Sequence, residues 1–265
     1  MIFSWWRRRR RRRIAARPFP ETWQRIIQRN VAQYPTLSES ERSKLYGDVR
    51  VFVSEKSWEG CNGLNLTDEI RVTIAANACL LLLGFDDFCF DRLQTVLVYP
   101  DRYVVAEKSL LPGGVVNEGV SLRLGEAWYR GPVILAWSSV RTAEQIPHKG
   151  RNVVIHEFAH RLDMLDHSVN GTPPLENATQ YDTWRAVMST EYEQLIHFSE
   201  QGRSTLLDPY GTSDEAEFFA VSSECFFEQP IEMADQHPQL YTVLRDFYHQ
   251  DPARRISRAM SLRRR

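Results

Sequence analysis

The spacing of apolar and polar residues predicts helices in the first third of the chain. Ser38 and Glu41 form a capping box, in which each residue satisfies a backbone N–H at a helix start. Thr67 and Asp68 are suited to capping a further helix, and Gly84 is suited to ending it. We therefore expect helices over residues 21–34, from Ser38 to about Phe52, and from Thr67 to Leu83.

Short β-rich runs replace this pattern between residues 94 and 137. Strands are predicted at residues 94–99, 102–105 and 133–137, with proline and glycine at their boundaries. Turns are expected at Gly113-Gly114 and at Gly119. After residue 150 the chain is predicted to be almost wholly helical. Helices, then a small sheet, then helices again favour an α+β fold with a small mixed sheet over a regular βαβ alternation.

The charges of the chain are distributed unevenly. Its 33 basic and 34 acidic side chains give a formal net charge of −1. Eight arginines lie within residues 1–17 and six within residues 254–265, and neither segment contains an acidic residue. Without these fourteen arginines, 19 basic residues stand against 34 acidic ones, so residues 18–253 carry about −15. We expect a disordered basic tail at residues 1–17, a single domain at residues 18–253 and a basic C-terminal tail at residues 254–265.

Composition excludes several classes of protein. A hydrophobic content of 43% and an aromatic content of 11% are enough to form a core, which excludes a disordered chain. No apolar run approaches the ~20 residues of a membrane span. Arg17 and Pro18 follow the first arginines too soon to leave room for the apolar region of a signal peptide. The four cysteines form no CxxC pair, so we expect a cytoplasmic protein with reduced thiols.

The segment after Asn152 carries the clearest chemical motif. His156, Glu157 and His160 form the pattern H-E-x-x-H, in which two histidines four residues apart project from one face of a helix. Both imidazoles can reach a single zinc ion, and the glutamate can take a proton from a bound water, whose pKa zinc lowers to about 7. The apolar residues around the motif predict a packed helix. The alternative is a pair of hydrogen-bonded core histidines.

A catalytic zinc site needs a third protein ligand. The extended pattern H-E-x-x-H-x-x-G-x-x-H would supply a third histidine, but this chain has Asp163 in place of the glycine and Asp166 in place of that histidine. His167 comes one residue after the histidine position. On an uninterrupted helix His167 would lie about 16 Å along the axis from His156, at about 1.5 Å per residue, too far to share its metal. Asp163 could accept a hydrogen bond from a ligand imidazole. Alternatively, it is solvated or paired with Arg161.

Two glutamates later in the chain are candidates for the third ligand. Thr212 and Glu215 predict the start of a helix that runs to about Phe227. On this helix Glu217 and Glu224 are seven residues apart and share one face. Carboxylates among so many phenylalanines are expected to be paired, because burying a bare charge is costly. Spacing does not choose between them, and exposure of both to solvent is the remaining alternative.

These motifs resemble those of the Mlc titration factor A family of bacterial zinc peptidases. The similarity rests on His-Glu-Phe-Ala-His-Arg-Leu-Asp, which starts at His156, and on Ser-Asp-Glu-Ala-Glu-Phe-Phe-Ala within residues 210–227. Residues 131–137 and 247–252 fit as well, so the resemblance covers roughly residues 35–255. Around its site the family is similar to the catalytic domain of anthrax lethal factor. The resemblance implies a zincin-like metallopeptidase fold.

The resemblance also implies roles for individual residues. Glu217 stands at the family's glutamate ligand position and would bind one zinc ion per chain together with His156 and His160. Tyr210 precedes Glu217 by seven residues, as does a tyrosine that faces the zinc in lethal factor, and would donate a hydrogen bond to the oxyanion. Some relatives carry an extra histidine ligand where this chain has Asn117, so we do not expect that ligand here.

The expected activity is zinc-dependent hydrolysis of peptide or protein substrates. Glu157 would take a proton from the attacking water and return it to the leaving amine. A strand at residues 96–99 or 133–137 could pair with an extended substrate, although a strand in the core sheet is the commoner role for such runs. The resemblance further implies contact with a glucose-responsive transcriptional repressor.

A second class of function starts from the arginine run of residues 7–13. Beside Trp5 and Trp6, these arginines could contact nucleic acid or an anionic membrane surface. The chain would then be a binding protein with a structural zinc. A solvated tail without such a role is the simpler alternative. Two features favour the enzyme: the acidic body would repel DNA, and H-E-x-x-H supplies a base that a structural site does not need.

Overall fold

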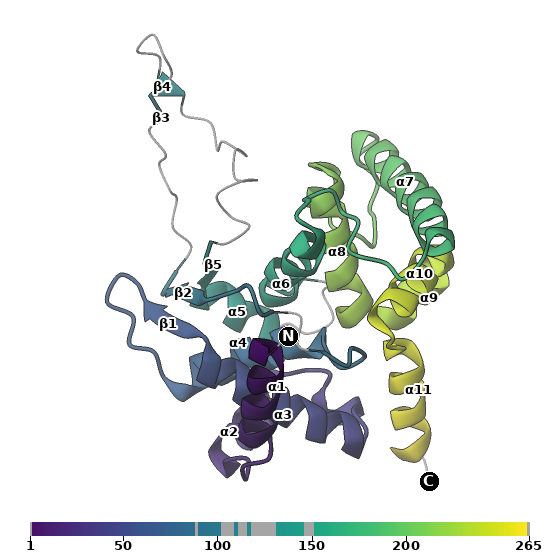
Figure 1. Ribbon diagram of the computed structural model, residues 1–265. Helices are drawn as coiled ribbons and strands as arrows, with labels where there is room; N and C mark the ends of the chain where they lie inside the picture. The colour runs from purple at the N-terminus through teal and green to yellow at the C-terminus, as the bar shows by residue number, and fades with distance from the viewer. Residues whose placement is uncertain are drawn as a thin grey trace.

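The computed structural model describes residues 2–87, 90–101, 109–110, 116–117, 131–145 and 151–263. A small sheet lies at one side of the molecule, and the helices that follow residue 150 lie together at the other side (Figure 1). The predicted α+β class is confirmed. The helices before residue 85 are α1 (Ile2–Ala15), α2 (Glu21–Asn30), α3 (Glu39–Glu55) and α4 (Asp68–Leu80), with the short 3₁₀ turn η1 (Tyr34–Thr36) between α2 and α3.

Three strands, β1 (Ser57–Gly60), β2 (Thr95–Tyr99) and β5 (Val133–Ala136), form one sheet in the order β1-β2-β5. Both pairings described for this sheet are parallel, whereas a mixed sheet was predicted. Between β1 and β2, a long connection that includes α4 returns the chain to the end at which β1 began, as parallel neighbours require. A separate antiparallel pair joins β3 (Ser109–Leu110) to β4 (Val116–Asn117). The strand and turns expected at residues 102–105, 113–114 and 119 lie outside the described residues.

The described chain after residue 150 is mostly helical, as predicted, and a helix that was not predicted, α5 (Trp137–Gln145), follows β5 directly. Two short 3₁₀ turns, η3 (Met164–Asp166) and η4 (Pro209–Thr212), separate longer helices. These helices are α6 (Val153–Asp163), α7 (Ala178–Glu200), α8 (Glu215–Glu228), α9 (Pro230–Gln236), α10 (Pro238–Tyr248) and α11 (Pro252–Arg263). Within the described residues no helix is long and apolar enough to cross a membrane.

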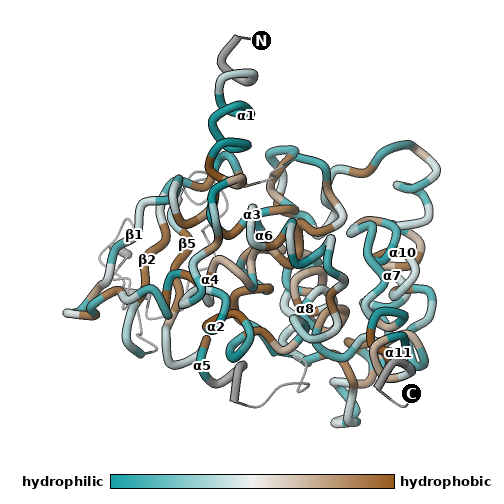
Figure 2. Tube along the Cα trace, turned by 90° about the horizontal axis from the view of Figure 1, so that it is seen from below, coloured by the Kyte–Doolittle hydropathy of each residue, from teal (hydrophilic) through white to brown (hydrophobic). Residues whose placement is uncertain are grey.

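The core lies between the sheet and the helices α4, α6 and α8. Figure 2 shows hydrophobic stretches along β2 and β5, whereas α1 is mostly hydrophilic. Phe158 of α6 is fully buried, and its ring centroid lies 5.5 Å from that of Phe52 in α3 and 4.8 Å from that of Phe90. Burial of such aromatic side chains contributes much of the stability of a core. This packing fixes α6 relative to the first half of the chain.

Most of the predicted helix starts are confirmed. The capping box of Ser38 and Glu41 is present at α3, and the Thr67 side chain accepts a hydrogen bond from the Ile70 N–H at α4. The start of α8 was predicted wrongly, because the cap is Asp214, which accepts from the Glu217 N–H at 2.9 Å. Asp214 is the better cap since its carboxylate reaches the third helical N–H, whereas position 212 belongs to η4.

The two basic ends are helical, which corrects the expectation of a disordered N-terminal tail. Helix α1 packs against α3, and Arg11 forms an ion pair with Glu55 at 2.6 Å. Helix α11 packs against α9 and η1, and Arg255 lies 2.6 Å from Glu41. The acidic body therefore supplies partners for some of the terminal arginines. The single-domain boundary at residues 18 and 253 consequently leaves out helices that pack on the domain.

Candidate metal centre

Helix α6 places both motif histidines on one side. Its start is fixed by Asn152, whose side chain accepts a hydrogen bond from the Ile155 N–H at 3.2 Å. The fully buried side chains of Phe158 and Ala159 anchor the helix in the core. His156 and His160 are therefore held one turn apart, and their Nε2 atoms are separated by 3.3 Å.

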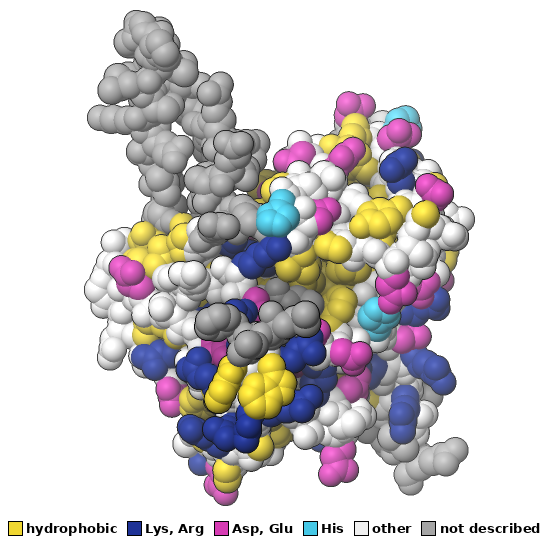
Figure 3. All heavy atoms as spheres, in the orientation of Figure 1, with side chains coloured by type: hydrophobic (Ala, Val, Ile, Leu, Met, Phe, Trp, Pro, Cys, Tyr) yellow, Lys and Arg dark blue, Asp and Glu magenta, His cyan; other side chains and the backbone are white. Residues whose placement is uncertain are grey.

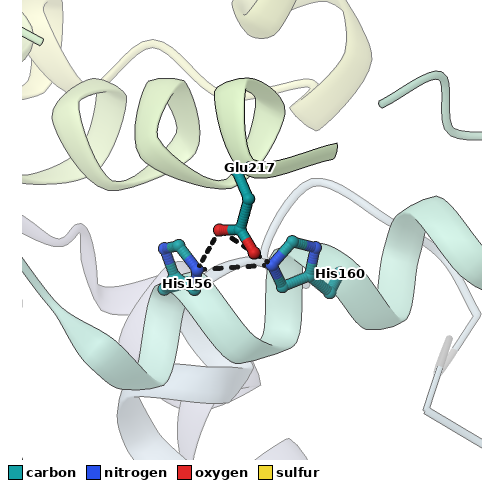
Figure 4. A group of neighbouring side chains, drawn as sticks. All are labelled: His156, His160 and Glu217. Carbon is teal, nitrogen blue, oxygen red and sulfur yellow. Dashed lines mark hydrogen bonds and ion pairs between the residues drawn. The ribbon is translucent and has the colours of Figure 1, made fainter. Parts of the chain in front are cut away.

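Helix α8 lies alongside α6 and brings Glu217 to the same point. All three side chains are directed toward one another from the two helices (Figure 4). Glu217 Oε2 lies 2.9 Å from His156 Nε2 and 3.5 Å from His160 Nε2. The three residues form a group whose possible ligand atoms all lie within 4.8 Å of one another. The structure thus brings together all three residues that were expected to hold the metal.

The geometry of this group fits a tetrahedral zinc ion. Zinc–nitrogen bonds of ~2.0–2.1 Å at tetrahedral angles place two ligand atoms roughly 3.3 Å apart, close to the observed separations. Glu217 Oε2 is buried and faces the Nε2 atoms of both histidines, at 2.9 Å from His156 and 3.5 Å from His160. Two imidazole nitrogens and a carboxylate oxygen that converge in this way are suited to a common cation.

The electrostatics of the group also favour a cation. Burial acts to lower the pKa of His156, but hydrogen bonds to Glu217 and Glu224 outweigh it and raise this pKa to about 10. Burial acts to raise the pKa of Glu217, but the hydrogen bonds from His156 and His160 lower it to about 2. The site therefore stabilises positive charge between its carboxylates, at the place where a divalent cation would replace a proton.

The second candidate carboxylate, Glu224, contacts the opposite edge of the His156 ring. His156 Nδ1 lies 2.7 Å from Glu224 Oε1, and the backbone N–H of Asn152 donates to the other oxygen of Glu224. Glu224 is only 6% exposed, so the alternative of a solvated carboxylate is wrong for this residue. A carboxylate in this position orients the imidazole and directs its Nε2 atom toward the point shared with Glu217.

Asp163 and His167 lie beyond the motif and do not belong to the group. Asp163 is fully buried, and its Oδ2 accepts the Gly171 N–H at 3.0 Å. It is neither solvated nor paired with Arg161, which donates to backbone carbonyls before β5. His167 is exposed at the end of η3, where its Nε2 lies 3.2 Å from an Arg92 nitrogen, away from the metal group as expected.

Glu157 and Tyr210 flank the group. Glu157 is half-buried beside His156, and no hydrogen bond or ion pair of its carboxylate is found in the described part of the chain. Tyr210 lies in η4, and its ring centroid is 6.1 Å from that of His156. Tyr210 is 54% exposed, and its remaining burial, followed by the charges of Glu217 and Glu157, raises its pKa to about 12. The hydroxyl is therefore protonated at neutral pH and can donate a hydrogen bond.

A buried polar cluster behind the site was not predicted. Asn152 Nδ2 donates to Asn77 Oδ1 of α4 at 3.0 Å and to Glu228 Oε1 of α8 at 2.8 Å. Gln33 Nε2 donates to the same Glu228 oxygen at 2.9 Å. The position of Asn152 before an apolar helical run could have identified it as a cap. Its side-chain partners are distant in sequence, and no sequence signal indicates them.

Two histidines on one helix, a glutamate on a neighbouring helix and a second glutamate beside the first histidine are typical of metallopeptidases that carry H-E-x-x-H. Comparison with known proteins places the chain within this class. It belongs to the glucose-regulated metallo-peptidase M90 family, whose profile matches residues 3–249. The match begins within α1, so the arginine run lies inside the family's extent, whereas the resemblance was expected to start near residue 35.

Several curated proteins are similar over most of their length. An uncharacterised protein of Synechocystis sp. is 41% identical over 248 residues, which cover 93% of this chain and 90% of that protein. The Mlc titration factor A of Serratia proteamaculans is 33% identical over 227 residues, 84% of this chain and 85% of that protein. The Mlc titration factor A of Pectobacterium atrosepticum is 32% identical over 240 residues, which cover 89% of this chain and 88% of that protein. The resemblance inferred from the motifs is thereby confirmed.

Proposed function

We propose that the chain is a zinc-dependent peptidase whose metal is held by His156, His160 and Glu217. The observation that carries this proposal is the convergence of two Nε2 atoms and one carboxylate oxygen on a single point between α6 and α8. Membership of a metallo-peptidase family supports the metal and the reaction class. Two imidazoles and one carboxylate are a donor set that zinc accepts in catalytic sites and that leaves one position open.

The chemistry of peptide hydrolysis assigns a task to each flanking residue. Zinc, when bound, would supply a Lewis acid that polarises the substrate carbonyl and lowers the pKa of water. Glu157 would accept the proton of the attacking water and transfer it to the nitrogen of the departing amine. The Tyr210 hydroxyl would donate a hydrogen bond to the oxygen of the former carbonyl as negative charge develops there.

The sheet suggests where an extended substrate would lie. In the described sheet β2 is the central strand, paired with β1 and β5, so both of its edges are occupied. Strand β5 has β2 as its neighbour on one side and leads directly into α5. Of the two strands considered for substrate pairing, only β5 remains suitable, and we propose that a peptide adds along its outer edge.

A regulatory partner is a further part of the proposal. The relatives from Serratia proteamaculans and Pectobacterium atrosepticum bear the name Mlc titration factor A. We propose by this similarity that the chain also contacts a transcriptional repressor. Co-purification of the chain with a repressor of that kind, compared with an unrelated repressor, tests this contact, and equal recovery of both would refute it.

Substitution of Glu157 separates catalysis from metal binding. Glu157→Gln removes the proton acceptor and keeps the size of the side chain, so hydrolysis of chromogenic peptides should fall by about 10²–10⁴-fold. Elemental analysis should still find one zinc per chain. Undiminished hydrolysis by this variant would refute the assigned role, and zinc without any hydrolysis by the unsubstituted chain would favour a binding protein with a structural zinc.

Substitution of the glutamates on α8 tests the ligand assignment. Glu217→Ala should remove most of the bound zinc, because it deletes one of three ligands. Glu215→Ala is the matched control, since Glu215 is an exposed glutamate two residues earlier on the same helix. The control should retain its zinc. Equal zinc content in the two variants would exclude Glu217 as a ligand.

A further inference from the structure

Helix α1 has two faces of different character. Arg7, Arg11 and Ile14, spaced four and three residues apart, form the inner face toward the body. Ile14 is 8% exposed, Arg11 lies 2.6 Å from Glu55, and Arg7 lies 2.9 Å from Asp91. These contacts hold the helix in place and neutralise part of its charge.

The outer face of α1 consists of Trp5, Trp6, Arg9, Arg12 and Arg13. Trp5 is 54% exposed and Trp6 is 60% exposed, which is unusual for the largest hydrophobic side chains of a protein. The Arg9 guanidinium lies 5.3 Å from the Trp5 ring centroid. For Arg12 and Arg13, both exposed, the described part of the chain offers no ion pair. Cationic and aromatic side chains thus share one solvent-facing surface.

The position of this face makes it accessible to a flat partner. The N-terminal part of α1 extends beyond the body of the molecule (Figure 2). In the space-filling view, basic and hydrophobic side chains gather over the helix (Figure 3). A planar surface can therefore contact the outer face without approaching the acidic body.

We propose that the outer face of α1 binds an anionic lipid surface. Arginines are attracted to the negative potential of anionic headgroups, and tryptophans favour the membrane–water interface. Both residue types are present together, and neither is covered by the protein. A nucleic acid is the less suitable partner, because an extended polyanion would also approach the body of residues 18–253, which carries about −15.

Vesicle binding of the full chain tests this proposal. Cosedimentation is measured with phosphatidylcholine vesicles that contain phosphatidylglycerol and with vesicles of phosphatidylcholine alone. Each arginine near an anionic surface contributes about a fivefold change in partitioning, so Arg9→Gln/Arg12→Gln/Arg13→Gln should weaken binding on the order of a hundredfold. Binding should also weaken as salt is raised, because the attraction is screened.

A second variant and a matched control separate the face from the overall charge. Trp5→Ala/Trp6→Ala should weaken binding without changing the charge. The control Arg25→Gln/Arg254→Gln/Arg258→Gln removes the same charge from exposed sites on α2 and α11 and should bind nearly as well as the unsubstituted chain. Thermal unfolding followed by circular dichroism should be unchanged in both outer-face variants, because none of the five residues belongs to the described core.

Three results would overturn the proposal. The first is vesicle binding that neither outer-face variant weakens. The second is an equal loss of binding in the control, which would show that only net charge matters. The third is tighter binding of single-stranded RNA than of phosphatidylglycerol vesicles through the same five residues, which would identify the face as a nucleic-acid site.

Discussion

Substitution of Glu224 tests whether its contact with His156 orients that imidazole for metal binding. Glu224 accepts from His156 Nδ1 at 2.7 Å with one oxygen and from the Asn152 N–H with the other. Glu224→Gln keeps the shape of the side chain but replaces one acceptor oxygen by a donor. Whichever way the amide is turned, its NH₂ group meets another donor, so one of the two contacts is lost.

The expected loss of zinc affinity follows from this contact. Replacement of the carboxylate that orients a metal-bound histidine weakens metal binding by about 10–100-fold, or roughly 1.4–2.7 kcal/mol. We expect the upper part of this range, because Glu224 is 6% exposed and water cannot easily replace the lost acceptor. The affinity is measured by competition with a chromophoric chelator at neutral pH.

Glu228→Gln is the matched control. Glu228 lies one turn further along α8 and is 5% exposed, and it accepts from the Asn152 and Gln33 side chains. Both substitutions perturb the buried polar cluster and should lower stability, but only Glu224→Gln should lower zinc affinity. If Glu224→Gln bound zinc as tightly as the unsubstituted chain, or if both variants lost affinity equally, the orienting role would be wrong.

Two further predictions concern the oxyanion donor and a turn behind the site. Tyr210→Phe should lower kcat by about 10²–10³-fold with little change in KM in steady-state assays, since its hydroxyl is assigned to the transition state. A higher KM with an unchanged kcat would contradict this role. Gly171→Ala should lower the free energy of unfolding in urea by at least about 2 kcal/mol, because Gly171 has φ +70° and an added Cβ would lie 2.2 Å from the Glu215 carbonyl oxygen. Gly202→Ala, with φ +66° and open space, should lose only about 1 kcal/mol, and a similar loss in both would remove the steric argument.

Local features of the chain were predicted well. The caps at Ser38 and Thr67 and the helix that carries His156 and His160 follow from residues within a few positions of one another. The errors also have local causes. The predicted cap, Thr212, and the actual cap, Asp214, lie two residues apart, and position 212 does not cap α8 because it belongs to the turn η4.

The charged ends show a different limit of prediction. An arginine run without acids nearby in sequence predicts a disordered segment, because such charges repel one another. The structure instead places Glu55 and Asp91 beside Arg11 and Arg7, and the run becomes a helix with one neutralised face. These partners are more than forty residues away in sequence. Only the folded body determines which arginines are paired and which face solvent.

The candidate site also combines features that one helix determines with features that only the folded chain determines. The convergence of His156 and His160 is a property of one helix, because four residues make about one turn and bring both imidazoles to the same side. The different tasks of Glu217 and Glu224 do not follow from one helix, because both residues share one face of α8 and their spacing does not distinguish them. The packing of α8 against α6 places Glu217 at the Nε2 atoms and Glu224 at Nδ1 of His156. That arrangement depends on the buried side chains between the two helices, which the tertiary structure alone positions.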